Sequence, residues 1–213
     1  MHLSAPTGNN AMAEDCTLCR VVDQRLAGQR PLYDTRLLET PSFVVIPALG
    51  PVWPGHVMVV SRSHIPNLAS MPRVGVVEYD ELVRTVSRMD SHGLFDVLEA
   101  EHGGAEGERG GACIIHVHVN LIPRAGSFVD MFDGELPLQD VDQSLNTLNP
   151  GAAPYILLRN SRDVRLYTAR KAPSQLIRRA LVAKLGREDW DWAVFPHHDV
   201  VEATVRMWRF QSD

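Results

Sequence analysis

The stretch that decides the fold is residues 113–123, which read Cys113-Ile114-Ile115-His116-Val117-His118-Val119-Asn120-Leu121-Ile122-Pro123. Successive side chains of a β-strand point to opposite faces, so His116, His118 and Asn120 share one face and apolar residues share the other. The pattern predicts a strand with an apolar back against a core and a polar front. Same-face neighbours lie roughly 6.5–7 Å apart, so this front could line a phosphate-sized ligand. The alternative is a half-exposed strand whose polar face meets solvent.

A glycine-rich run, residues 102–111, comes directly before this strand and reads HGGAEGERGG. Glycine adopts backbone conformations that are closed to other residues, which lets several amide N–H groups turn toward one anion. A glycine loop that leads into a histidine-bearing strand therefore favours a functional site over a solvated strand.

Composition limits the classes of protein. The 213 residues suffice for one sizeable core, and no apolar run approaches the roughly 18–20 residues of a membrane span. A net charge of −5 argues against a nucleic-acid-binding role. Arginines gather in the C-terminal part, where they form either a solvated face or a site for a phosphate-bearing small molecule: Arg159, Arg162, Arg165, Arg170, Arg178 and Arg179.

The N-terminal region contains a tail and a cysteine pair. Residues 1–14 lack the basic start and apolar segment of a signal peptide and are expected to form a disordered tail. Three cysteines do not make a disulfide framework, so a reducing cytoplasm is expected. Cys16 and Cys19 form a Cys-x-x-Cys pair, which is a redox pair, half of a zinc site or two ordinary small residues.

Periodicity and turn residues predict a mixed series of strands and helices. A helix is expected to follow Cys19, and Ser174 is expected to cap a C-terminal helix that ends at Gly186. Trp190, Trp192 and Phe195 are expected to be packing residues. Strands are predicted over residues 32–39, 43–46, 56–61, 95–100, 155–159 and 164–168, with the last two forming a hairpin, and further helices over residues 79–89 and 200–210; residues 127–150 are expected to be mostly loop.

The residues resemble those of the histidine-triad (HIT) superfamily, which includes the galactose-1-phosphate uridylyltransferase branch. Its signature is His-x-His-x-His with apolar residues between, and here residues 116–122 read HVHVNLI. Other matching stretches are Cys16-x-x-Cys19, Pro54-Gly55-His56-Val57, Ser63-His64-Ile65 and Glu101-His102-Gly103. The resemblance implies an α+β fold, an antiparallel sheet with helices on one side. It places a catalytic core at residues 15–125 and a C-terminal extension at residues 126–213 packed on that core.

The resemblance also implies roles for individual residues. His118 would be a nucleophile on the α-phosphorus of a nucleoside phosphate or nucleotide sugar, which forms a covalent nucleotidyl-histidine intermediate. His56 would line the same pocket. Four residues would contact the substrate: Gly110, Gly111, Cys113 and His102. The amide N–H groups of the glycine loop would hold the phosphate oxygens as negative charge develops on them. Relatives commonly form homodimers, so a homodimer is a further expectation.

The resemblance further implies a zinc site. Cys16, Cys19, His64 and His116 would form a Cys₂His₂ set, which is the composition of a closed structural site. One ring nitrogen of His116 on the metal would fix that ring beside His118.

Asn120 is the departure from the pattern, because HIT hydrolases carry a third histidine there and the uridylyltransferase branch carries glutamine. An amide can hydrogen-bond a phosphate oxygen but cannot exchange protons near neutral pH. Three functions therefore stay open: a nucleotidyl hydrolase or transferase acting through His118, a nucleotide-binding module with lost or weak turnover, and a zinc hydrolase with His116 and His118 on an open metal. In the first, the leaving group, His56 or His102 would supply the missing proton.

Overall fold

The computed structural model describes residues 16–23, 31–88, 96–104, 112, 114–141 and 153–209. The predicted tail of residues 1–14 and three predicted substrate contacts, Gly110, Gly111 and Cys113, lie outside the described residues. Among the described residues, no helix is both long enough and apolar enough to cross a membrane.

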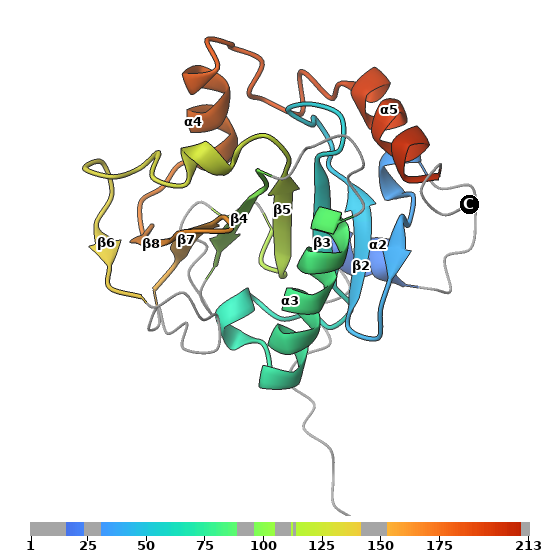
Figure 1. Ribbon diagram of the computed structural model, residues 1–213, viewed down its shortest axis with the longest axis horizontal. Helices are drawn as coiled ribbons and strands as arrows, with labels where there is room; N and C mark the ends of the chain where they lie inside the picture. The colour runs from blue at the N-terminus through green and yellow to red at the C-terminus, as the bar shows by residue number, and fades with distance from the viewer. Residues whose placement is uncertain are drawn as a thin grey trace, which may run out of the picture.

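The described residues form one eight-stranded sheet in the order β1-β2-β3-β5-β4-β7-β8-β6, and every pairing in it is antiparallel (Figure 1). This confirms the predicted α+β class and antiparallel sheet. The strands are β1 (Leu38–Glu39), β2 (Phe43–Pro47), β3 (Val57–Ser61), β4 (Leu98–Gly103), β5 (His118–Ile122), β6 (Leu138–Gln139), β7 (Tyr155–Arg159) and β8 (Val164–Thr168).

Helices lie on both faces of the sheet, where the sequence predicted them on one side. The long helix α3 packs on one face and contributes Val76, Tyr79 and Leu82 to the core there. The opposite face carries α2 over β2 and β3, and α4 over β4, β7 and β8. The helices are α2 (Thr17–Val22), α3 (Arg73–Arg88), α4 (Leu176–Lys184) and α5 (His198–Arg209), with 3-10 turns η1 (Leu32–Asp34), η2 (Leu68–Ser70) and η3 (Gly126–Phe128).

Strand β5 alternates as the sequence predicted. Val119 and Leu121 are buried in the core beneath α3, while His118 and Asn120 point to the other face. Asn120 lies in a row of paired residues that runs across the sheet through Met58, Asn120, Ala100 and Leu158, so all four point to the same face. Met58 packs with the cluster of α2, and Ala100 and Leu158 pack with that of α4, so both helices share this face with the polar residues of β5. The polar front of β5 therefore lies in the gap between two apolar clusters. The strand begins only at His118, so His116 precedes it in a bend.

The structure confirms one local prediction and corrects two others. The predicted hairpin of residues 155–168 has the predicted bounds, with Asn160 accepting hydrogen bonds from the backbone of Arg162 and Asp163 in the turn. Residues 32–39 were wrongly predicted as one strand, because a 3-10 turn takes residues 32–34. Helix α4 begins at Leu176, and its N-cap is Gln175 in a left-handed conformation rather than Ser174.

The C-terminal segments hold the loop that precedes β3. The Gly50 N–H donates to the Pro196 carbonyl, Arg187 donates to the Val52 carbonyl, and the Gly55 N–H donates to the Thr204 hydroxyl. Gly50 has φ +62°, and a Cβ there would lie 2.6 Å from the Cβ of Trp192. Only glycine allows this loop and the segment around Trp192 to approach so closely.

The face beneath α3 buries two carboxylates, which the sequence did not single out. Glu99 accepts hydrogen bonds from the Tyr79 hydroxyl (2.8 Å) and from two nitrogens of Arg159 (2.8 and 2.6 Å). Glu101 accepts from the Tyr155 hydroxyl (2.5 Å) and the Leu68 N–H (2.8 Å). Burial raises the pKa of Glu101 to about 7. Every carboxylate oxygen of this pair thus has a protein donor.

Candidate active site

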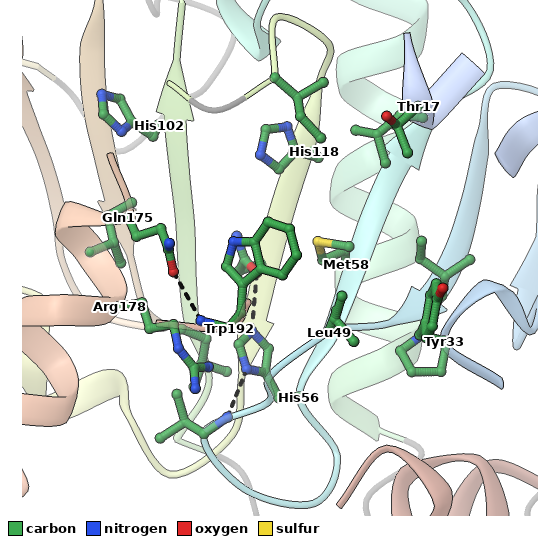
Figure 2. Close-up of a pocket in the computed structure, with 18 of the residues that line it drawn as sticks. Thr17, Tyr33, Leu49, His56, Met58, His102, His118, Gln175, Arg178 and Trp192 are labelled. Carbon is green, nitrogen blue, oxygen red and sulfur yellow. Dashed lines mark hydrogen bonds between the residues drawn. The ribbon is translucent and has the colours of Figure 1, made fainter. Parts of the chain in front are cut away.

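A pocket of about 440 Å³ opens on the face opposite α3. Strands β3 and β5 form its floor through Met58, His118 and Asn120, and His56 lies directly before β3. Figure 2 shows His56, Met58 and His118 around the cavity. One wall comes from the N-terminal half and is mainly apolar, with Thr17 and Asp34 as its polar members: Thr17, Leu18, Val21, Tyr33, Asp34, Ile46, Pro47, Leu49 and Val52. The wall across the pocket comes from the C-terminal segments: Gln175, Leu176, Ile177, Arg178 and Trp192. Such a mainly apolar cavity with a few convergent polar groups is typical of small-molecule sites.

His118 is held in one tautomer. Its Nδ1 lies 2.6 Å from the carbonyl oxygen of His116, and a carbonyl only accepts, so Nδ1 carries the proton. Burial lowers the pKa of His118, which keeps the ring neutral. The other ring nitrogen, Nε2, is therefore an unprotonated lone pair on a side chain that lines the pocket. This is the state that a nucleophilic imidazole requires.

His56 and Asn120 form an oriented pair beside His118. The Val52 N–H donates to Nδ1 of His56 (3.2 Å), which leaves the proton on Nε2, and Nε2 donates to the side-chain oxygen of Asn120 (3.1 Å). The Asn120 oxygen is thereby occupied, and its NH₂ group is left as the donor for the pocket. Burial lowers the pKa of His56 to about 3. His56 thus carries a single proton near neutral pH, and that proton is already donated to Asn120.

The four predicted metal ligands come together at the edge of the same face. The ligand atoms of Cys16, Cys19, His64 and His116 all lie within 4.8 Å of one another. Nδ1 of His116 is 3.4 Å from Sγ of Cys16, and Nδ1 of His64 is 3.2 Å from Sγ of Cys19. Burial and the neighbouring Cys16 raise the pKa of the Cys19 thiol to about 12, as expected for two sulfurs packed together.

The orientation of His116 fits a metal ligand. Nε2 of His116 donates to the Ser61 carbonyl (2.7 Å), so its Nδ1 is a lone pair that faces the cysteines. Burial lowers the pKa of His116 to about 4, which keeps it neutral. Two cysteine sulfurs and two imidazoles at this spacing could hold a metal ion, and the donor set suits zinc.

The predicted site residues thus fall into two groups. His118, His56, Asn120 and His102 line the pocket, whereas His116 belongs to the cysteine cluster and contacts the site through its carbonyl. The sequence missed the wall across the pocket. Trp192, predicted as a packing residue, is 40% exposed and lines the cavity. The signal for Arg178 was present in the arginine cluster, but nothing distinguished it from its five neighbours.

Comparison with known proteins gives limited similarity over about half of the chain. No family model matches it. The chain is 25% identical over 114 residues to "Protein hit" of Bacillus subtilis, which is 54% of this chain and 74% of that protein. It is 26% identical over 121 residues to the asymmetrical bis(5'-nucleosyl)-tetraphosphatase of Schizosaccharomyces pombe, which is 57% of this chain and 62% of that enzyme.

Among solved structures, the chain is similar to a hypothetical histidine triad nucleotide-binding protein from Sulfolobus tokodaii. The two share 26% sequence identity with a TM-score of 0.38, over 51% of this chain and 68% of the other. This chain is thus similar to each of these three proteins over roughly half of its residues.

Proposed function

We propose that this chain is a histidine-triad-type nucleotidyl hydrolase or transferase, in which His118 carries the nucleotidyl group. The observation that carries the proposal is the hydrogen bond from Nδ1 of His118 to the His116 carbonyl, which leaves an unprotonated Nε2 in the pocket. The similarity to a nucleosyl-tetraphosphatase supports the substrate class.

The reaction would proceed in two steps. The Nε2 lone pair attacks the α-phosphorus of a nucleoside phosphate, the new P–N bond forms, and the bond from phosphorus to the leaving oxygen breaks with its electron pair on that oxygen. Water or a phosphorylated acceptor then attacks phosphorus, the P–N bond breaks, and His118 returns to its neutral form. Water gives up a proton in this step, and the product is a nucleoside monophosphate.

Asn120 would act as a hydrogen-bond donor in both steps. His56 holds the amide oxygen, so the NH₂ group is available for a non-bridging or leaving oxygen. Because the pKa of His56 is about 3 and its one proton is already shared with Asn120, His56 is a poor general acid near neutral pH. A leaving group that is already a stable anion, such as a phosphate, needs no protein acid.

The cysteine cluster would hold a structural zinc ion. Cys16, Cys19, His64 and His116 would bind it, and the metal would fix His116, whose carbonyl orients His118. The alternative of a zinc hydrolase with both histidines on an open metal gains no support from this geometry. Within the described residues, His118 is not part of the metal-ligating group, and its Nδ1 is engaged by a carbonyl.

Intact-protein mass spectrometry after brief mixing with nucleoside phosphates and nucleotide sugars, at neutral or alkaline pH, tests the proposal. A mass increment of one nucleoside monophosphate, absent from His118→Ala, is the expected result. Its decay with and without candidate acceptors would separate hydrolase from transferase. Nucleotide that binds without an increment or turnover would overturn the enzyme in favour of a binding module, for which Asn120 in place of histidine is the motivating observation.

A further inference from the structure

The wall of the pocket formed by the C-terminal segments carries a cation that the proposed chemistry has not used. Arg178 lies in the first turn of α4 and lines the pocket together with Gln175 and Trp192. Figure 2 shows Arg178 and Gln175 on one side of the pocket and Tyr33 and Leu49 on the other, with His118 and Trp192 between them. The pocket therefore carries the Arg178 cation on the side opposite Tyr33 and Leu49.

Two backbone carbonyls fix the Arg178 guanidinium. Nε donates to the Trp190 carbonyl (2.5 Å) and Nη2 donates to the Asp189 carbonyl (2.9 Å). The remaining nitrogen, Nη1, is buried and has no hydrogen-bond partner among the residues that the structure describes. A buried donor without a partner is costly, and a ligand is one way to satisfy it.

Arg178 makes no direct ion pair with a described carboxylate, although the Asp189 and Asp191 carboxylates act on it from further away and raise its pKa. No described carboxylate lies within ion-pair distance of its guanidinium, and the Asp189 carboxylate instead bonds Arg187 and His197. Burial lowers the pKa of Arg178 to about 10, so the group stays charged near neutral pH. Arg159, by contrast, is paired with Glu99 and Asp80 beneath α3.

Arg178 is also close to the oriented pair beside the nucleophile. Its charge contributes to the lowered pKa of His56, after burial as the main cause. A substrate with its α-phosphorus at His118 and its base against the apolar wall would extend its leaving group toward Arg178. The planar guanidinium is well suited to bind phosphate oxygens.

We propose that Arg178 binds a phosphate of the leaving group, so that the chain selects nucleoside phosphates whose leaving group is itself a phosphate chain. This assignment rests on the proposed function, since it takes the reacting phosphate to lie at His118. It makes the C-terminal segment part of substrate selection. Arg178 would then act together with the NH₂ group of Asn120 on the leaving-group side of the substrate.

The kinetic test compares two substrates with the same nucleoside, diadenosine tetraphosphate and adenosine 5′-(4-nitrophenyl phosphate). Arg178→Gln is expected to lower kcat/KM on the tetraphosphate by roughly 10- to 100-fold, as for the loss of a hydrogen bond to a charged group, and to leave the nitrophenyl ester nearly unchanged. Arg178→Lys is expected to restore part of the preference. Arg206→Gln, which removes an exposed charge from α5, is the control and should change neither rate. An equal loss on both substrates would overturn the assignment and show that Arg178 only supports the fold.

A binding measurement separates this assignment from the proposed function. In His118→Ala, calorimetry with ADP and AMP should show tighter binding of ADP, and Arg178→Gln in the same background should remove that preference. An ADP-to-AMP affinity ratio that Arg178→Gln leaves unchanged would sink the role of Arg178. Failure of the proposed function would have a different signature, namely no turnover and no covalent adduct in the wild type with either adenosine substrate.

Discussion

The two faces of the sheet bury polar side chains for different purposes. Beneath α3, Glu99 and Glu101 are enclosed by Tyr79, Tyr155, Arg159 and backbone N–H groups, and each carboxylate oxygen has a donor. On the opposite face, hydrogen bonds to described residues engage Nδ1 of His118 and the side-chain oxygen of Asn120. The Nε2 lone pair of His118 and the NH₂ group of Asn120 are left for the cavity that both side chains line. A closed network contributes to the fold, whereas an open one is available to a ligand. Burial alone does not distinguish the two.

Replacing the proposed nucleophile should give the largest effect and should affect only the open face. His118→Ala is expected to lower kcat by a factor of at least about 10³, because a covalent step loses its nucleophile. The melting temperature should change little, since His118 lies at the edge of a cavity. Steady-state rates and thermal melts measure the two quantities. Turnover near the wild-type rate would contradict the role of His118.

Removing a ligand from the cysteine cluster should come next in size. Cys19→Ser is expected to reduce bound zinc to well below one equivalent and to cost several kcal/mol of folding stability, because a closed zinc site contributes its binding free energy to the fold. Elemental analysis of the purified protein and chemical denaturation measure these effects. Wild-type protein that contains no metal and melts unchanged in chelator would rule out the structural site.

Breaking the closed network should have the opposite signature to His118→Ala. Tyr155→Phe removes the donor to one oxygen of Glu101, and an unsatisfied buried acceptor costs about 1–3 kcal/mol. Stability measured by denaturant should fall by this amount while kcat stays within about twofold of wild type, because Tyr155 does not line the pocket. A large loss of kcat with unchanged stability would show that the two faces are coupled in catalysis.

The smallest expected effect is a change in how steeply the free energy of unfolding varies with pH. Burial raises the pKa of Glu101 from 4.5 to about 7, so between these values the folded protein keeps a proton that the unfolded chain has lost. The free energy of unfolding contributed by this group is therefore full below pH 4.5 and falls as the pH rises toward 7, by at most about 1.4 kcal/mol per pH unit. Glu101→Gln should flatten the stability profile over this window, as measured by denaturation at several pH values. An unchanged slope would show that Glu101 titrates outside the window.

Much of the fold could be predicted because its strongest elements are local. The alternation in β5 and the Asn160 turn between β7 and β8 follow from sequence spacing and turn chemistry. The four cysteine and histidine residues were identified from their resemblance to a family pattern, and the structure brings them within ligand distance of one another.

The second wall of the pocket could not be predicted, because it depends on long-range packing. Trp192 reaches the cavity only because Gly50 lets two segments approach, and nothing in the spacing of Gly50 and Trp192 reveals that contact. Arg159 and Arg178 look alike in the sequence, yet Glu99 pairs with the first and backbone carbonyls hold the second. The difference between a solvated, paired or ligand-binding arginine is decided by neighbours that are distant in the chain.

The hydrogen bond between the Gly55 N–H and the Thr204 hydroxyl bears on how the protein is made. It joins residues 149 positions apart, and together with the contacts of Val52 with Arg187 and Gly50 with Pro196 it holds the loop that carries His56. Synthesis proceeds from the N-terminus, so β2, β3 and β5 leave the ribosome well before residues 187–204 do. The half of the site that carries out the proposed chemistry is thus translated early but is held in its final geometry late. A nascent chain that stops before Thr204 would contain His56, His118 and Asn120. It would still lack the hydrogen bond from Gly55 to Thr204 that helps to hold the loop carrying His56.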